Sequence, residues 1–145
     1  MNPGKVLPGE IVLAERGGWQ VVADSETVYV LNLSGTRWDI GWLYGNPCGA
    51  LVTADENYVV VVGCGVLVAD LTCFGEEVAP GETWAQTPAV HLLASPGEHW
   101  FFEGVYEGSS PGAVQVVADL GGEHAGVYEL VLSTLALVPR WRERW

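Results

Sequence analysis

Residues 58–71, YVVVVGCGVLVADL, form the most apolar stretch of the chain, and its runs 59–62 and 66–69 are apolar on both alternating faces. Two runs of β-branched or small apolar residues, 59–62 and 66–69, flank a Gly-Cys-Gly segment, which is the composition of two strands joined by a tight turn. A hairpin that is open to water on one face alternates apolar and polar positions instead. The pattern therefore predicts a buried β-hairpin that other parts of the chain cover on each side.

A related pattern recurs along the sequence. Residues 19–36, WQVVADSETVYVLNLSGT, and residues 114–134, VQVVADLGGEHAGVYELVLST, share QVVAD, a polar loop, VY and an alternating apolar strand. The hairpin at 58–71 is a third and looser copy. Residues 89–105, with turn residues at 95–98, are a fourth candidate. Short strands separated by turn residues in this way indicate an all-β chain.

Hairpins that end in a polar residue, Leu and Ser or Thr resemble the inner strands of β-propeller blades. Blades take about 40 to 50 residues and propellers usually have at least about four blades. The chain has 145 residues and thus room for about three. The sequence predicts one all-β domain at residues 1–145, with antiparallel hairpins stacked as a small propeller-like or sandwich domain. Radial closure and stacking of two sheets both stay open.

Two further stretches differ from the hairpins in composition. Residues 38–49, WDIGWLYGNPCG, are rich in Gly and aromatic residues, which predicts a loop with aromatic anchors. Residues 139–145, PRWRERW, reverse the charge of the chain and predict a basic aromatic C-terminal tail or a closing strand. The closing strand is preferred, because its Trp side can cover the core while its Arg side meets the acidic body of the protein.

The charge is unbalanced, with 18 acidic residues against 6 basic ones and a formal net charge of −12. Phosphate binding depends on Lys and Arg, so nucleic acid is not expected as a partner. An acidic surface keeps a protein dispersed, and part of it can also steer a basic protein into contact. The first residues do not form an apolar leader, and the longest apolar segment is too short for a membrane helix. We therefore expect a cytoplasmic protein with no membrane partner.

Catalytic and metal-binding motifs are not found in the sequence, which has neither a GxSxG elbow nor a phosphate loop. His91, His99 and His124 lack the i, i+2 or i, i+4 spacing that is typical of a metal site. We therefore expect no metal, no cofactor and no catalytic residue. A divergent enzyme that uses one of these three histidines is kept as an alternative.

The strings GCGVLVADL, at residues 63–71, and EHAGVYELVLSTLALV, at residues 123–138, resemble stretches of the immunity proteins that bacteria make against polymorphic or contact-dependent toxins. The resemblance implies an inhibitor that occupies the active site or substrate surface of a basic toxin. Charge would steer the encounter and buried Trp side chains would slow release. The expected function is thus a small acidic protein-binding module and not an enzyme. Exposed sheet edges leave self-association open.

The candidate partner-binding residues are acidic groups near predicted turns, together with two Trp, a residue type that is common in interface hot spots. They are Asp55, Glu56, Glu76, Glu77, Trp84, Glu98, Trp100, Glu103 and Glu107. The alternative function is a small-molecule binding β-domain, in which Trp38, Trp42 and Tyr44 line a pocket at one end of the sheets.

Overall fold

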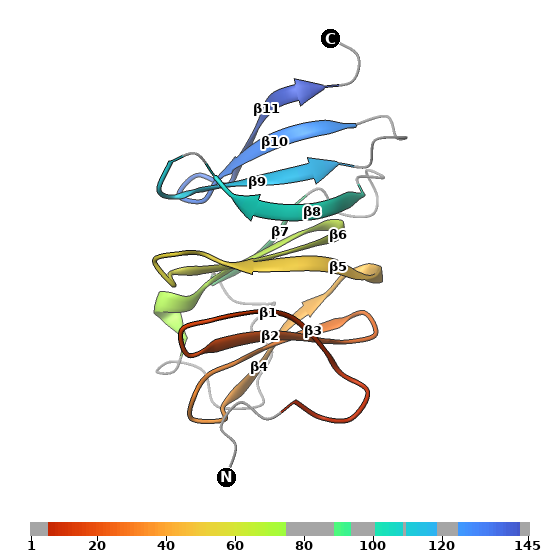
Figure 1. The fold of residues 1–145 in the computed structure, drawn as a ribbon, viewed down its shortest axis with the longest axis vertical. Coiled ribbons are helices and arrows are strands. Elements are labelled where there is room, and N and C mark those ends of the chain that lie inside the picture. Colours follow the sequence, from red (N-terminus) through yellow and green to blue (C-terminus); the bar gives the residue numbers. More distant parts are fainter. Residues whose placement is uncertain (1–5, 75–88, 94–100, 109, 119–124, 143–145) are drawn as a thin grey trace.

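The computed structural model describes residues 6–74, 89–93, 101–108, 110–118 and 125–142, which form a stack of three antiparallel β-sheets (Figure 1). The sheet nearest the N-terminus lies at one end of the stack and the sheet nearest the C-terminus at the other (Figure 1). This architecture confirms the predicted all-β fold class. No helix in the described ranges is long and apolar enough to cross a membrane.

The first sheet contains four strands in chain order. They are β1 (Ile11–Arg16), β2 (Trp19–Asp24), β3 (Thr27–Leu31) and β4 (Arg37–Trp42). β2 and β3 pair from Gln20 with Leu31 to Asp24 with Thr27, so the first copy of the repeat is the predicted hairpin. Its turn places Ser25 at a φ of 53°, a region that short polar residues tolerate better than β-branched ones.

The second sheet has the order β5-β6-β7, and a short 3-10 helix lies between β6 and β7 in the chain. Its elements are β5 (Tyr44–Val52), β6 (Tyr58–Asp70), β7 (Val90–Leu93) and the helix η1 (Leu71–Cys73).

The strand β6 is the predicted buried hairpin. The backbone N–H of Leu71 donates to the carbonyl oxygen of Asn57 at 2.8 Å, although the two residues lie on either side of a strand of 13 residues. A straight strand of that length would hold its ends about 40 Å apart. β6 therefore folds back at residues 63–65 into two arms. β5 pairs with the first arm and β7 with the second.

The third sheet has the order β11-β10-β9-β8. Its strands are β8 (Phe102–Glu107), β9 (Ala113–Ala118), β10 (Gly126–Val131) and β11 (Ala136–Arg142). The hairpin β9–β10 is the second copy of the sequence repeat, and it occupies the same middle place in its sheet as β2–β3 and the two arms of β6. The internal repeat is thus a repeat of sheets.

Two expectations about strands are wrong. Residues 38–49 are not a single loop, because β4 covers residues 37–42 and pairs with β3, and β5 covers residues 44–52 and pairs with β6 at Tyr44 and again from Gly49. The fourth hairpin, at residues 89–105, does not form either. β7 pairs with β6 in the second sheet and β8 pairs with β9 in the third, so the two strands belong to different sheets. Residues 139–142 of the predicted tail are part of β11, an edge strand that pairs with β10.

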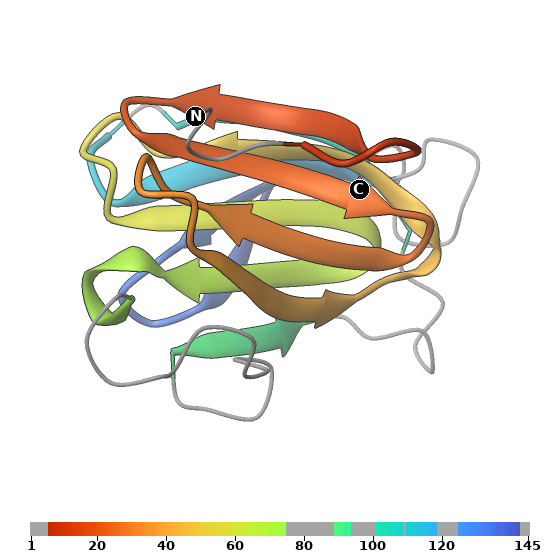
Figure 2. The same cartoon turned by 90° about the horizontal axis from the view of Figure 1, so that it is seen from below.

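The side chains of β6 alternate between two hydrophobic cores. Those that face the first sheet are Val59, Val61, Leu67 and Ala69, and those that face the third sheet are Val60, Val62, Val66 and Val68. All of them are buried. The prediction that other parts of the chain cover both faces of this hairpin is confirmed, and Figure 2, which looks along the stack, shows the sheets lying one behind another.

An ion pair fixes the segment before β1 to β4, an edge strand of the first sheet. The two guanidinium nitrogens Nη1 and Nη2 of Arg37 donate to Oε2 and Oε1 of Glu10, each at 2.7 Å. The Arg37 guanidinium also lies 4.6 Å from the centre of the Tyr29 ring. The hydrogen bond from Arg37 lowers the pKa of Glu10, whose side chain is only 3% exposed. This forked and shielded ion pair is therefore part of the packing of the first sheet.

Trp38 is a core residue and not the wall of a pocket. Its side chain is 1% exposed, and its ring centre lies 6.0 Å from that of Trp19 and 5.1 Å from that of Phe74. Trp42 and Tyr44 are exposed at the junction of β4 and β5. The three aromatic residues that were expected to share a pocket are therefore separated into one buried and two surface groups.

The burial of Trp38 leads to a stability prediction with a matched control four residues away. Trp38→Ala should lower the free energy of unfolding by about 3–5 kcal/mol, because it leaves a cavity between the first two sheets. Trp42→Ala removes the same side chain from a position that is 56% exposed and should change stability by about 1 kcal/mol or less. Urea unfolding followed by circular dichroism measures both values. Equal losses would contradict this assignment of the core.

Candidate functional site

The first hairpin turns of the three sheets lie together at the left-hand ends of the strands in Figure 1. The described residues of these turns are 17–18, 53–57, 108 and 110–112. β1 lies beside β5 and β5 beside β8, so the first strands of the three sheets follow one another along one side of the stack. We call this end, with its three turns, the hairpin end. It joins segments that are far apart in the sequence.

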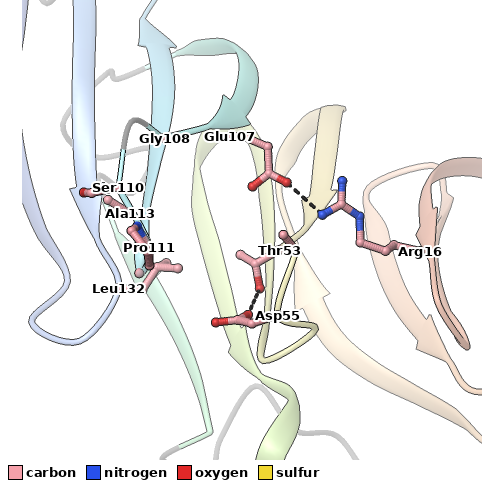
Figure 3. A pocket seen from close by; sticks show the side chains of 11 residues that line it. Arg16, Thr53, Asp55, Glu107, Gly108, Ser110, Pro111, Ala113 and Leu132 are labelled. Atoms are coloured by element: carbon pink, nitrogen blue, oxygen red, sulfur yellow. Dashed lines mark hydrogen bonds and ion pairs between the residues drawn. The ribbon is translucent and has the colours of Figure 1, made fainter.

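A cleft of about 520 Å³ opens at the hairpin end, between the β5–β6 and β8–β9 turns (Figure 3). It is lined by Arg16, Thr53, Ala54, Asp55, Glu107, Gly108, Ser110, Pro111, Gly112, Ala113 and Leu132. Charged groups, hydroxyl groups and small apolar side chains all contribute to its walls. Ligand sites commonly combine a few polar groups with apolar surface in this way, which makes the cleft a candidate site.

The β5–β6 turn holds Asp55 in place through its own hydrogen bonds. The Thr53 hydroxyl donates to Asp55 Oδ1 at 2.6 Å, and the backbone N–H of Asn57 donates to the same oxygen at 2.9 Å. The backbone N–H of Tyr58 in turn donates to Thr53 Oγ1 at 3.1 Å. The bond from Thr53 is the largest cause that lowers the pKa of Asp55. This carboxylate is therefore charged at neutral pH and fixed in direction.

Glu56 connects this turn to the first sheet. A Cβ atom at Gly17 would lie only 2.1 Å from Glu56 Oε1, so the carboxylate occupies the space that a side chain would need. Gly17 also has a φ of 59°, a backbone conformation that glycine adopts without strain. The β1–β2 and β5–β6 turns consequently lie against each other at the hairpin end.

Arg16 and Glu107 connect the first sheet to the third. Arg16 Nη1 donates to Glu107 Oε2 at 2.8 Å, and the two side chains are 38% and 46% exposed. Each is the last residue of the first strand in its sheet, β1 or β8. The pair lies at one side of the cleft (Figure 3).

The β8–β9 turn forms the opposite wall. A Cβ atom at Gly108 would lie 2.3 Å from the carbonyl oxygen of Ala113, so a larger residue would push the two ends of the turn apart. The backbone N–H of Leu132 donates to the carbonyl oxygen of Gly112 at 2.9 Å. This bond fixes the β8–β9 turn to the β10–β11 turn, so the neighbouring turn holds this wall of the cleft in place.

The structure brings together only part of the predicted partner-binding set. Asp55 and Glu107 line the cleft, and Glu56 lies beside it against Gly17. Glu103 is exposed near the start of β8, and its charge adds to the effect of burial and of Cys64 in raising the pKa of Cys48. The other predicted residues lie outside the described part of the chain, and they are Glu76, Glu77, Trp84, Glu98 and Trp100.

Arg16 was not predicted as a site residue. A single basic residue in an acidic chain gives no local signal of binding, and only its position before Gly17 and Gly18 marks it as the end of a strand. Among the histidines, His91 is exposed on β7, and His99 and His124 lie outside the described residues. Within the described ranges, no group of three or more His, Cys, Asp or Glu side chains is arranged to hold a metal ion.

The fold and the cleft define a class of protein: an all-β chain of stacked antiparallel sheets with an acidic cleft formed by hairpin turns. Comparison with known proteins takes the assignment no further, because no protein-family model, curated protein or solved structure matches the chain.

The hydroxyl of Thr53 provides a test of how the cleft is held. Thr53→Val keeps the side-chain shape but leaves the Asp55 carboxylate and the Tyr58 N–H without this partner, which should lower the free energy of unfolding by about 1–2 kcal/mol. The matched control is Thr72→Val. Its exposed hydroxyl donates to Asp70 Oδ1 at the same distance of 2.6 Å, and its loss should change the free energy of unfolding by about 0.5 kcal/mol or less.

The same variant has an expected pH dependence. The pKa of Asp55 is lowered in the folded protein, so its contribution to stability is present above the unfolded pKa of about 3.9 and is lost as the pH falls through the lower folded value. The stability difference between wild type and Thr53→Val should therefore shrink in acid. Chemical unfolding between neutral pH and pH about 2 measures it. A difference that stays constant would contradict the role given to the Thr53 bond.

Proposed function

We propose that this chain is a small acidic protein-binding module of the immunity type, which occupies the active site or substrate surface of a basic toxin in the cytoplasm. The observation that supports the proposal is the meeting of Asp55, Glu56 and Glu107 at the hairpin end, around a single cleft. Distant parts of the sequence supply these carboxylates, and the stacking of the sheets brings them to one surface.

The charge of this surface suits a basic partner. The whole chain carries a formal net charge of −12, and the lowered pKa of Asp55 keeps that group ionised. Carboxylates gathered at one end attract a positively charged protein more strongly at short range than the same charges spread over the surface. Such complementarity mainly raises the rate of association and makes it sensitive to salt.

The rigidity of the end supports a binding role as well. The turn that carries Asp55 is held by hydrogen bonds, and the turn that follows Glu107 is fixed by a backbone bond to Leu132, so little order has to be gained when a partner binds. The strings that resemble immunity proteins, by contrast, fall largely in β6, β10 and β11. In the proposed function those strands supply the scaffold and the turns supply the contact.

A small-molecule binding domain is the second candidate. The cleft volume of about 520 Å³ lies within the range of about 300–1,000 Å³ that is usual for ligand pockets. This candidate requires a ligand that raises the melting temperature. A thermal-shift screen with sugars and nucleotides distinguishes it from the protein-binding module.

The proposed function predicts a charge-dependent association with a basic protein. Tagged protein is used at low salt to capture its partner from extracts of the native host, the partner is identified by mass spectrometry, and its activity is measured with increasing amounts of this chain. We expect a basic protein that is inhibited at a 1:1 ratio. Asp55→Asn with Glu56→Gln should slow association by about tenfold or more at low salt, because two charges of the steering field are lost.

The matched control removes two acidic charges away from the cleft, by Asp24→Asn with Glu26→Gln. Both residues lie at the β2–β3 turn and neither lines the cleft. The control should keep nearly the wild-type rate. A partner that is acidic, that retains full activity in the complex or that loses affinity equally with both double variants would refute the proposed function.

A further inference from the structure

We propose that the cleft at the hairpin end binds an arginine side chain of the basic partner, and that this side chain takes the place of Arg16 on Glu107. The inference rests on the proposed function for the nature of the partner. The site itself is argued from the geometry of the cleft, which can be tested without any partner protein.

Two carboxylates of the cleft come from different sheets. Figure 3 shows Asp55 in the β5–β6 turn, with its carboxylate turned toward the wall that contains Pro111 and Leu132, and Glu107 above it at the end of β8. Arg16 approaches Glu107 from the first sheet, on the side away from that wall (Figure 3). A cation that enters the cleft would therefore meet Asp55 and Glu107 without passing through Arg16.

The Arg16 pair has the features of an exchangeable contact. It consists of one hydrogen bond at 2.8 Å between side chains that are both more than a third exposed. The Arg37 pair, by comparison, has two bonds at 2.7 Å to a buried carboxylate. Exposed single-bond ion pairs contribute little to stability. A second guanidinium can replace Arg16 at small cost to the fold.

The remainder of the cleft selects for a long side chain with a cationic end. Ala54, Pro111, Ala113 and Leu132 supply apolar surface beside the carboxylates. An arginine buries its methylene groups on apolar surface while its planar guanidinium forks onto carboxylate oxygens. A metal ion or a free ammonium ion would leave the apolar surface unused. The combination of lining and charge thus favours arginine.

The first test uses a short synthetic probe, acetyl-Gly-Arg-Gly-amide, titrated into the ¹⁵N-labelled protein at low salt. We expect saturable shifts of the amide resonances of residues 53–57, 108, 110, 112 and 113, with little change elsewhere. The same peptide with citrulline, which has the shape of arginine but no charge, should produce no such shifts. A lysine peptide should bind about fivefold more weakly, because an ammonium group cannot fork onto a carboxylate.

Three variants separate the parts of the proposal. Asp55→Asn should weaken binding of the arginine peptide about tenfold. Ala54→Trp alters no charge and fills the cleft from an exposed position, and it should abolish binding. Arg16→Gln should strengthen binding severalfold, because the internal competitor is removed. The control Arg140→Gln removes an equal charge from β11, outside the cleft, together with the ion pair between Arg140 and Glu129. It should leave the affinity unchanged, and circular dichroism checks that the variant is folded.

Several results would overturn the inference. Equal binding of the citrulline peptide, or wild-type affinity in Ala54→Trp, would show that the cleft is not an arginine site. Equal affinity for the lysine peptide would contradict the claim that the cleft prefers arginine. An unchanged affinity in Arg16→Gln would contradict the claim that the bound side chain displaces Arg16. If the peptide binds as expected but no basic partner exists, the proposed function fails and the site stands. If binding of a partner depends on Asp55 and Glu56 but the peptide does not bind, the proposed function stands and the arginine site fails.

Discussion

The structure depends on one hairpin that is buried on both faces. In β6, successive side chains enter different cores, so each arm packs against two other sheets at once. Because the Val runs are apolar on both faces, a slip of one residue would still place Val in each core. Apolarity alone therefore does not set the register. The glycine turn at residues 63–65 and the bond between Asn57 and Leu71 at the base of the hairpin do so.

The elements that could be predicted from the sequence are those whose pairing is local. The hairpins at β2–β3, β6 and β9–β10 each join neighbouring strands through a short or glycine-rich connection, so apolar alternation and turn residues were enough. The stretch 38–49 failed because its Gly and aromatic content indicated a loop, whereas most of it belongs to β4 and β5, with a turn closed by the bond from the Asn46 N–H to the Leu43 carbonyl. Residues 89–105 failed because a turn signal does not say whether the flanking strands share a sheet.

The candidate site, too, could be predicted only as far as local sequence patterns reach. Net charge and turn positions identified Asp55, Glu56 and Glu107 as surface acids, but their meeting depends on how the three sheets stack, and no local pattern carries that information. Arg16 was missed for the same reason. Alignment of the repeats offers a signal that was available, because Arg16 and Glu107 both end the first strand of a sheet. Equivalent positions in stacked repeats fall side by side.

The two ion pairs between distant segments show how stability and recognition are divided in this molecule. Arg37 and Glu10 are forked, shielded and part of the packing of the first sheet, whereas Arg16 and Glu107 share one exposed bond. The cores between the sheets supply the stability, and the turns that connect the strands are left free to carry charge. Carboxylates held near one another at such an end repel, and one arginine offsets only part of that repulsion. A basic side chain from outside would offset the rest, which is why we place recognition at the hairpin end and not on the faces of the sheets.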